Sequence, residues 1–239
     1  MYRSRELMNI SLIAVAITFA LSTALAKDNE FVTIFDGKTL EGWDGDPKFW
    51  RVEDGAITGQ TTKENPTRGN TFIVWKGGEP ADFELELEYK IEGGNSGIQY
   101  RSFRKSKTDP WRIGGYQADF EAGDTYSGIC YGEAFRGILS HRGQKTTLSL
   151  DDKGKLVRKA EKFGESAEIG KAVKKGEWNA YRIVARGYEF TQYINGVKTT
   201  VLIDNDEKAR RAKGLLALQL HAGPPMKVQF RNIRLKQAN

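Results

Sequence analysis

The sequence predicts an all-β protein, a sandwich or barrel of short strands. Apolar and polar side chains alternate with a period of two in many segments, as in residues 83–91, and this period belongs to strands with one buried face. Gly, Asn and Asp separate these segments, which is typical of turns between strands. Asn195 and Gly196 give the strongest hairpin indication, because a type I′ turn needs positive φ at both central positions.

Each expected element follows from this alternation, taken in chain order. The expected strands are residues 31–35, 50–52, 71–75, 83–91, 96–101, 116–121, 178–185, 189–194, 197–201, 215–221 and 228–235. Residues 206–213 are expected to form the one short helix, which Gly214 would end. No repeat, linker or low-complexity tract divides the chain after its N-terminus, so one domain over residues 27–239 is expected.

The N-terminus has the order of a secretory signal peptide. Arg3 and Arg5 precede an apolar run over residues 10–25, and a small-residue cleavage site ends at Ala26. An uncleaved membrane anchor is the alternative, although the run is short for a full span. We therefore expect residues 1–26 to be removed, no stable membrane span afterwards, and a secreted or periplasmic protein.

Charge and cysteine content exclude several classes of protein. The net charge of +6 is scattered and lacks the interleaved aromatic residues of a nucleic-acid groove, so no nucleic-acid partner is expected. Cys130 is the only cysteine, so no internal disulfide can form. Its place between Ile129 and Tyr131 favours a small buried apolar side chain over a nucleophile.

Two neighbouring runs carry the candidate site. In residues 95–101, Gln99 and Arg101 share one strand face, and in residues 115–121 the same holds for Gln117, Asp119 and Glu121. A solvated sheet face is the alternative, but such faces are usually rich in Lys and Thr. Amide, carboxylate and guanidinium groups beside glycines suit a polar ligand that approaches the backbone closely.

Four ordered blocks resemble the 3-keto-disaccharide hydrolase domain. They are residues 35–43, 50–57, 95–98, and 219–221 with 228–233. The resemblance implies a concanavalin-like jelly roll of two curved antiparallel sheets, in exported bacterial proteins that act on glycosides oxidised at the third carbon of the sugar. Family members often carry Glu where this chain has Gln117. That departure implies a different sugar, or binding without catalysis.

The chemistry implied by this resemblance needs a base, an enolate stabiliser and a proton donor to the leaving oxygen. A ketone at C3 acidifies the hydrogen on C2, and the resulting enolate can expel the aglycone from C1. The base candidates are His141, Asp119, Glu121 and His221, with His141 preferred because it precedes Arg142 in a polar segment. Arg101 and Arg142 are expected to hold the developing negative charge.

The remaining candidates concern binding of the carbohydrate. The expected substrate-binding residues are Asn95, Ser96, Gln99, Gln117, Trp111, Arg142, Gln219 and His221. Trp111, in a polar loop, is the preferred platform for stacking against a sugar ring, whereas Trp43, Trp50 and Trp178 follow core-like patterns. A divalent cation held by Asp119, Glu121 and the two histidines is a further candidate, although no dense ligand motif is present.

Alternatives remain open at this point. Glu84, Glu86 and Glu88 alternate as the paired carboxylates of laminarinase-type glucanases do, but they lack the intervening aspartate, and we expect an outer, solvated face. A non-catalytic carbohydrate-binding module, or a surface interaction domain for another polymer, fits the same fold. The sequence also leaves open the anomer, the aglycone, and whether the reaction ends in hydrolysis or elimination.

Overall fold

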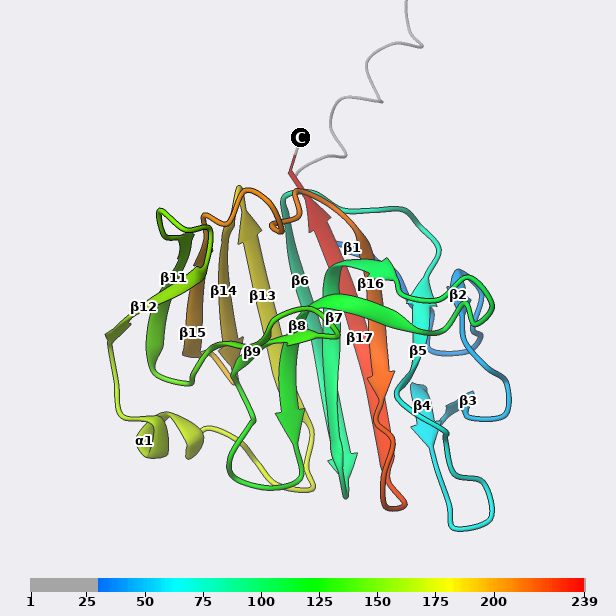
Figure 1. The fold of residues 1–239 in the computed structure, drawn as a ribbon. Helices are drawn as coiled ribbons and strands as arrows, with labels where there is room; N and C mark the ends of the chain where they lie inside the picture. Colours follow the sequence, from blue (N-terminus) through cyan, green and yellow to red (C-terminus); the bar gives the residue numbers. More distant parts are fainter. Residues whose placement is uncertain (1–29, 239) are drawn as a thin grey trace, which may run out of the picture.

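The computed structural model describes residues 30–238, which form strands and one short helix (Figure 1). The elements are β1 (Val32–Thr33), β2 (Trp43–Asp44), β3 (Trp50–Glu53), β4 (Ala56–Gln60), β5 (Thr71–Trp75), β6 (Phe83–Glu92), β7 (Asn95–Arg104), β8 (Ile113–Glu121), β9 (Cys130–Glu133), β10 (Gly137–Ser140), β11 (Gln144–Leu150), β12 (Leu156–Lys162), α1 (Ser166–Gly170), β13 (Asn179–Arg186), β14 (Glu189–Ile194), β15 (Val197–Asp204), β16 (Leu215–Leu220) and β17 (Lys227–Gln237).

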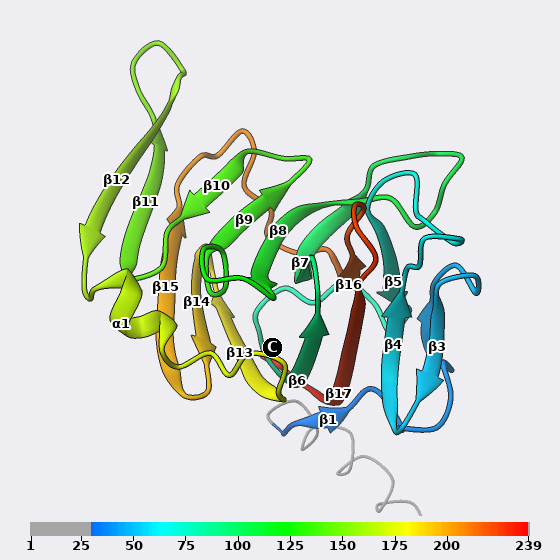
Figure 2. The ribbon, with the colours of Figure 1, turned by 90° about the horizontal axis from the view of Figure 1, so that it is seen from below.

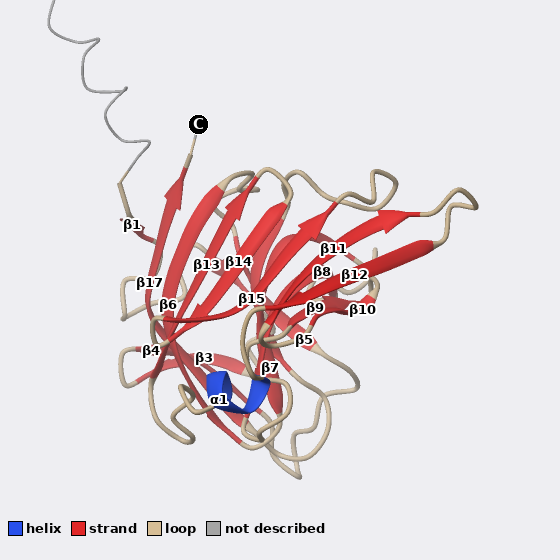
Figure 3. Ribbon diagram, turned by 90° about the vertical axis from the view of Figure 1, so that its left-hand side faces the viewer, coloured by secondary structure: helices blue, strands red, loops and turns tan. Residues whose placement is uncertain are grey.

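The strands form two sheets that pack face to face (Figures 2 and 3). The ten-stranded sheet has the order β12-β11-β15-β14-β13-β6-β17-β4-β3, with β1 beside β17, and the seven-stranded sheet has the order β10-β9-β8-β7-β16-β5-β2. Neighbours in the described chain pair antiparallel except β11 and β15, which run parallel. The expected all-β sandwich of two sheets is confirmed.

In strand β6, apolar and charged side chains alternate, so one set faces the other sheet and the other set faces outward. Phe83, Leu85 and Leu87 are buried between the sheets, as expected from their period of two. The intervening glutamates lie on the outer face of the ten-stranded sheet and pair with arginines, for example Glu84 with Arg182 at 2.5 Å. This ion-paired face confirms the expectation of an outer charged surface, and part of it lines a groove of about 780 Å³.

Aromatic side chains from both sheets fill the core. The Tyr89 and Phe120 rings, one from each sheet, lie 3.8 Å apart between centroids. Burying an apolar side chain of this size contributes roughly 1.5–3 kcal/mol. Cys130, Trp43 and Trp50 are also buried, as expected. Trp178 is the exception: it is partly exposed, and the Arg231 guanidinium lies 4.0 Å from its ring centroid.

The expected hairpin turn is confirmed and the expected helix is wrong. Asn195 and Gly196 have φ of 49° and 79°, and they join β14 to β15 as a tight turn needs. Residues 206–213 form turns instead of a helix. Tertiary hydrogen bonds hold this segment, since the Arg211 carbonyl accepts from Arg101 and the Arg211 N–H donates to the Tyr116 hydroxyl. Such contacts override a weak local helix propensity.

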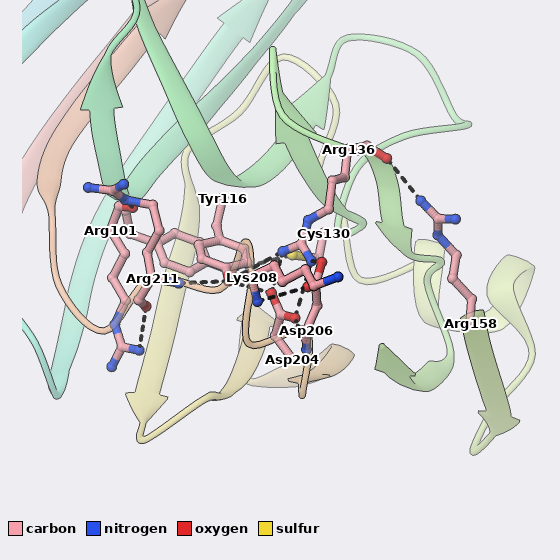
Figure 4. A network of polar contacts seen from close by, with 10 residues as sticks. Arg101, Tyr116, Cys130, Arg136, Arg158, Asp204, Asp206, Lys208 and Arg211 are labelled. Carbon is pink, nitrogen blue, oxygen red and sulfur yellow. Dashed lines mark hydrogen bonds and ion pairs between the residues drawn. The ribbon is translucent and has the colours of Figure 1, made fainter. Parts of the chain in front are cut away.

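A buried ionic cluster, which we call the clasp, ties the two sheets together at one end (Figure 4). Arg136, in the β9–β10 turn, pairs with Asp204 of β15 and lies 3.0 Å from Asp206. The Tyr116 hydroxyl of β8 donates to Asp204 at 2.5 Å. Because β8 and β15 belong to different sheets, these bonds cross the sandwich.

Candidate functional site

Polar side chains gather on the face of the seven-stranded sheet that points away from the ten-stranded sheet. On β7 and β8, the residues Ile98 and Phe120 enter the core, so Gln99, Gln117 and Asp119 point to the opposite face. The register places Gln99 opposite Gln117, and Gly97 opposite Asp119. The predicted shared face of these three polar residues is therefore confirmed.

A continuous chain of hydrogen bonds runs across this face. Asp119 accepts from Asn95 at 2.8 Å and from Gln117 at 2.6 Å, and Gln117 accepts from Gln99 at 2.6 Å. Gln117 also donates to Gln219 of β16 at 3.4 Å. The chain continues to Glu133 and Asn70. We call the set the amide network: Asn70, Asn95, Gln99, Gln117, Asp119, Glu133 and Gln219.

The amide network has a buried floor and a more open rim. Gln99, Gln117 and Gln219 are almost fully buried, and Asp119 is 4% exposed. The rim residues Asn70, Asn95 and Glu133 are partly exposed. A polar ligand at the rim would thus meet amide donors and acceptors first, with the Asp119 carboxyl group below them.

Burial raises the pKa of Asp119 to about 7. The N–H bonds from Asn95 and Gln117 oppose this shift, and the carboxylates of Glu121 and Glu133 add to it, but desolvation is the largest cause. The group therefore changes its charge near neutral pH, where a general base needs to be poised.

Gly97 provides the space in which the network assembles. A Cβ atom built on Gly97 would lie 2.7 Å from Gln117 Nε2, closer than such contacts occur. The Gln117 side chain therefore lies directly over the glycine backbone, and this close approach brings its amide to Asp119.

Glu133 and Asn70 belong to the site although the sequence did not single them out. Glu133 Oε2 accepts from Gln219 at 3.4 Å, and Glu133 Oε1 accepts from Asn70 at 3.2 Å. The alternation in β9, where Cys130 is buried and Tyr131 and Glu133 are partly exposed, carried a signal for Glu133. Asn70 lies in a loop, where no period indicates the direction of a side chain.

The expectation that Arg101 shares this face is wrong, and Figure 4 shows its side chain beside Arg211. Arg101 is 1% exposed, and its guanidinium donates to the carbonyls of Ala81 and Gly187 and pairs with Asp82 at 2.9 Å. It also lies 5.0 Å from the ring centroid of Phe190, in the other sheet. The reason is a bulge in β7, where Arg101 has φ of 44° and the pairing with β8 shifts register.

Glu121 and Arg142 both brace the loop between β8 and β9. Glu121 Oε1 accepts the backbone N–H groups of Thr125 and Tyr126 at 2.6 and 2.9 Å. The buried Arg142 guanidinium donates to the carbonyls of Ser127 and Asp124, and burial lowers its pKa. Neither side chain joins the hydrogen-bond chain of the amide network.

The two histidines lie in different surroundings. His221 follows β16 two residues after Gln219, and the next backbone N–H, of Ala222, donates to Asn70 Oδ1 at 3.0 Å. His141 is exposed in the turn after β10 and lines a separate cavity of about 320 Å³ with Arg142. The geometry thus brings His221, rather than the preferred His141, to the rim of the network.

The other two expected binding residues have structural partners. The Ser96 hydroxyl is buried and donates to the Gln219 carbonyl at 2.7 Å, so it joins β7 to β16. Trp111 is partly exposed and donates from Nε1 to Asp44 at 3.0 Å, beside the edge strand β2. Trp111 stays a prediction as a stacking platform.

Among residues 30–238, no group of three or more His, Cys, Asp or Glu side chains is arranged to hold a metal ion. The proposed gathering of Asp119, Glu121 and both histidines is thus not formed. The expected signal peptide, residues 1–26, lies outside the described residues. Within the described part of the chain, no helix is long and apolar enough to cross a bilayer.

Known proteins share sequence or fold with this chain. A 3-keto-disaccharide hydrolase of Bacteroides thetaiotaomicron is 42% identical in an alignment that covers 29% of this chain and 27% of the relative. A candidate glycosyl hydrolase of Parabacteroides distasonis has a similar structure (TM-score 0.55, 22% identity, 87% of this chain and 100% of that one). So does the carbohydrate-binding module CBM66 of Bacillus subtilis (TM-score 0.52, 16% identity, 82% and 96% covered).

At these identities the two solved structures show the shared fold alone. The family model is more specific, because it matches residues 30–236, nearly the whole described chain. The chain therefore belongs to the family of 3-keto-alpha-glucoside-1,2-lyase-like domains.

Proposed function

We propose that this protein is an exported enzyme that cleaves 3-keto-glycosides, and that Asp119 is the base that removes the C2 proton. Membership of the family and the name of the Bacteroides relative support the substrate class. The observation that carries the assignment of the base is the buried Asp119 carboxyl group, held by two amides on a polar face.

The reaction uses the acidity that the C3 ketone gives to the neighbouring C2–H bond. Asp119 takes the C2 proton, and the electron pair forms an enolate with the C3 oxygen. The enolate then reforms the ketone as the C1–O bond breaks, so that a C1–C2 double bond forms and the aglycone leaves with the electron pair of that bond. General-base catalysis of this kind contributes roughly 10²–10⁴-fold.

The amides of the network are expected to bind the sugar and to stabilise the negative charge that forms on it during the reaction. Gln117 and Asn95 fix the orientation of the Asp119 carboxyl group, since each donates to one of its oxygens, and the partly exposed Asn95 can also contact sugar hydroxyl groups. Amide N–H groups fixed beforehand are suited to an oxygen that becomes negative during the reaction. His221, at the rim, is the second candidate to contact the substrate.

A non-catalytic carbohydrate-binding module is the second candidate function. It is favoured by the amide of Gln117 at a position where the family resemblance implies a glutamate. Side-chain amides bind sugar hydroxyl groups without transferring protons.

One experiment separates the two functions. The purified protein is mixed with both anomers of 4-nitrophenyl 3-keto-glucoside and with the matching unoxidised glucosides. The enzyme is expected to release nitrophenol only from a 3-keto substrate, because the unoxidised sugar has no acidic C2–H bond. Binding of the sugars without release would support the binding module and contradict the enzyme.

A further inference from the structure

Glu133 is a second carboxylate on the same face as Asp119, and it reaches there from a different strand. Asp119 lies in β8 and Glu133 in the neighbouring β9, and the hydrogen bonds through Gln117 and Gln219 connect them. The two groups also affect each other electrostatically, since the charge of Glu133 is among the causes that raise the Asp119 pKa. They are therefore parts of one site.

Glu133 accepts longer hydrogen bonds than Asp119 and is more exposed, which suits a step that involves water. Its two oxygens accept amide N–H bonds of 3.2 and 3.4 Å, whereas Asp119 accepts bonds of 2.8 and 2.6 Å. Bonds near the upper limit of length are weak and readily exchanged. Glu133 is also partly exposed, whereas Asp119 is buried. A water molecule can thus replace an amide at Glu133 at little cost.

After the aglycone has left, the reaction needs a group that accepts a proton from water. Asp119 then carries the proton from C2 and is an acid, so it cannot also accept a proton from water. Glu121 braces the loop after β8, where its Oε1 accepts two backbone N–H groups, and it does not join the amide network. The contact of His221 Nδ1 with the carbonyl of Ala222, at 2.5 Å, involves that nitrogen alone, and His221 is not a member of the amide network. Glu133 is the carboxylate of the amide network that remains ready to accept a proton.

We propose that Glu133 is the general base that activates water for addition to the eliminated intermediate. This assignment rests on the proposed function, and it makes the protein a hydrolase in which elimination is the first half of the reaction.

The steps balance in atoms and charge. In the first half, the departing aglycone oxygen takes a proton from solvent water. In the second half, the water oxygen bonds to C1 as Glu133 takes one of its protons, and the C1–C2 double bond becomes the enolate. Asp119 returns its proton to C2, the ketone reforms, and Glu133 gives its proton back to solvent. The net reaction is a 3-keto-glucoside plus water giving 3-keto-glucose and the free aglycone.

The test follows both halves of the reaction with 4-nitrophenyl 3-keto-glucoside. Absorbance reports release of nitrophenol, and proton NMR reports the enone and the 3-keto-glucose. For Glu133→Gln, nitrophenol release is expected within about threefold of the wild-type rate, while hydration slows by about 100-fold or more and the enone accumulates. The matched control Glu84→Gln, on the outer charged face, should release nitrophenol and hydrate the enone as the wild type does.

A conservative variant guards against a folding defect. Glu133→Asp keeps the carboxylate but shortens the side chain by one methylene. The two variants should have the same melting temperature, and Glu133→Asp should accumulate less enone than Glu133→Gln. Wild-type hydration by both variants would overturn the assignment. So would a loss of nitrophenol release as large as that of Asp119→Asn, because Glu133 would then act in the first half. A wild-type protein that releases no nitrophenol would instead remove the proposed function itself.

Discussion

At the scale of single residues, the behaviour of Asp119 is decided by two opposing effects. Removing the carboxylate from water raises its pKa, and the N–H groups of Asn95 and Gln117 lower it. Desolvation is the larger effect, because no cationic group of the described chain pairs with this carboxylate. The result is a pKa of about 7, against about 4 for an exposed aspartate.

This shift predicts a pH dependence of stability that needs no substrate. Between about pH 4 and pH 7 the folded protein keeps a proton on Asp119 that the unfolded chain has lost. Its contribution to the free energy of unfolding is therefore full below about pH 4 and lost as the pH rises through about 7. Asp119→Asn should remove this contribution, which denaturant unfolding at several pH values would measure. An unchanged difference between wild type and variant from pH 4 to pH 8 would contradict the shift.

The residue-scale site was only partly predictable from the sequence. Strand alternation identified Gln99, Gln117 and Asp119, because a period of two decides the face of a regular strand. The same rule failed for Arg101, since a bulge shifts the register at that residue. Asn70 was missed, because the direction of a loop side chain depends on tertiary contacts.

At the scale of elements, the site depends on how closely β7 and β8 approach each other. Gly97 of β7 leaves space that the Gln117 side chain of β8 fills. The loop that follows β8 is fixed by Glu121 and Arg142, through its backbone N–H and carbonyl groups respectively. Asp119 lies near the end of β8 and Glu133 is the last residue of β9, so their positions are set by the pairing of these two strands and by the bonds of the loop between them.

Gly97→Ala is expected to damage the site more than the fold. The new methyl group would push the Gln117 amide away from Asp119, and a displacement of about 1 Å at a reacting group can cost on the order of 100-fold in rate. Overpacking costs about 1–3 kcal/mol in stability. The measurement is nitrophenol release beside thermal unfolding.

Gly196→Ala is the matched control, because it strains a turn far from the network. Gly196 has φ of 79° and open space around its missing side chain, so the cost is about 1 kcal/mol of backbone strain with unchanged activity. Equal rates for the two variants would show that Gly97 has no special part in the site.

The elements were predicted well where patterns are local. The hairpin at Asn195 and Gly196 follows from the φ that its turn requires, and β6 follows from its alternation. Residues 206–213 could not be predicted, because hydrogen bonds to Arg101 and Tyr116, more than 90 positions earlier, fix their path.

At the scale of the whole molecule, the clasp adds buried ionic and hydrogen bonds between the two sheets to their hydrophobic packing. Asp204 is fully buried, so it needs Arg136 and the Tyr116 hydroxyl as partners. Removal of one partner of a buried pair typically costs about 3–5 kcal/mol, because the remaining charge stays in the interior.

Arg136→Met is therefore expected to lower the free energy of unfolding by about 3 kcal/mol in denaturant titrations. The double variant Arg136→Met/Asp204→Asn should lose less than the sum of the single variants, since the second change removes the unpaired charge. Additive losses would mean that the two residues do not act together. The amide network lies on the outer face of the seven-stranded sheet, so activity at a temperature where the variants stay folded should persist.

The proposed function depends on Asp119 as the base that removes the C2 proton of a 3-keto-glycoside. Its most direct test is the pH dependence of kcat/KM for nitrophenol release, which reports the groups of the free enzyme. The rate of the wild type should rise with pH through about 7, as Asp119 loses its proton. Asp119→Asn should lack this rise and be slower by about 100-fold or more at pH 8. If Asp119→Asn keeps the wild-type rate and profile, another group is the base and the claim is wrong.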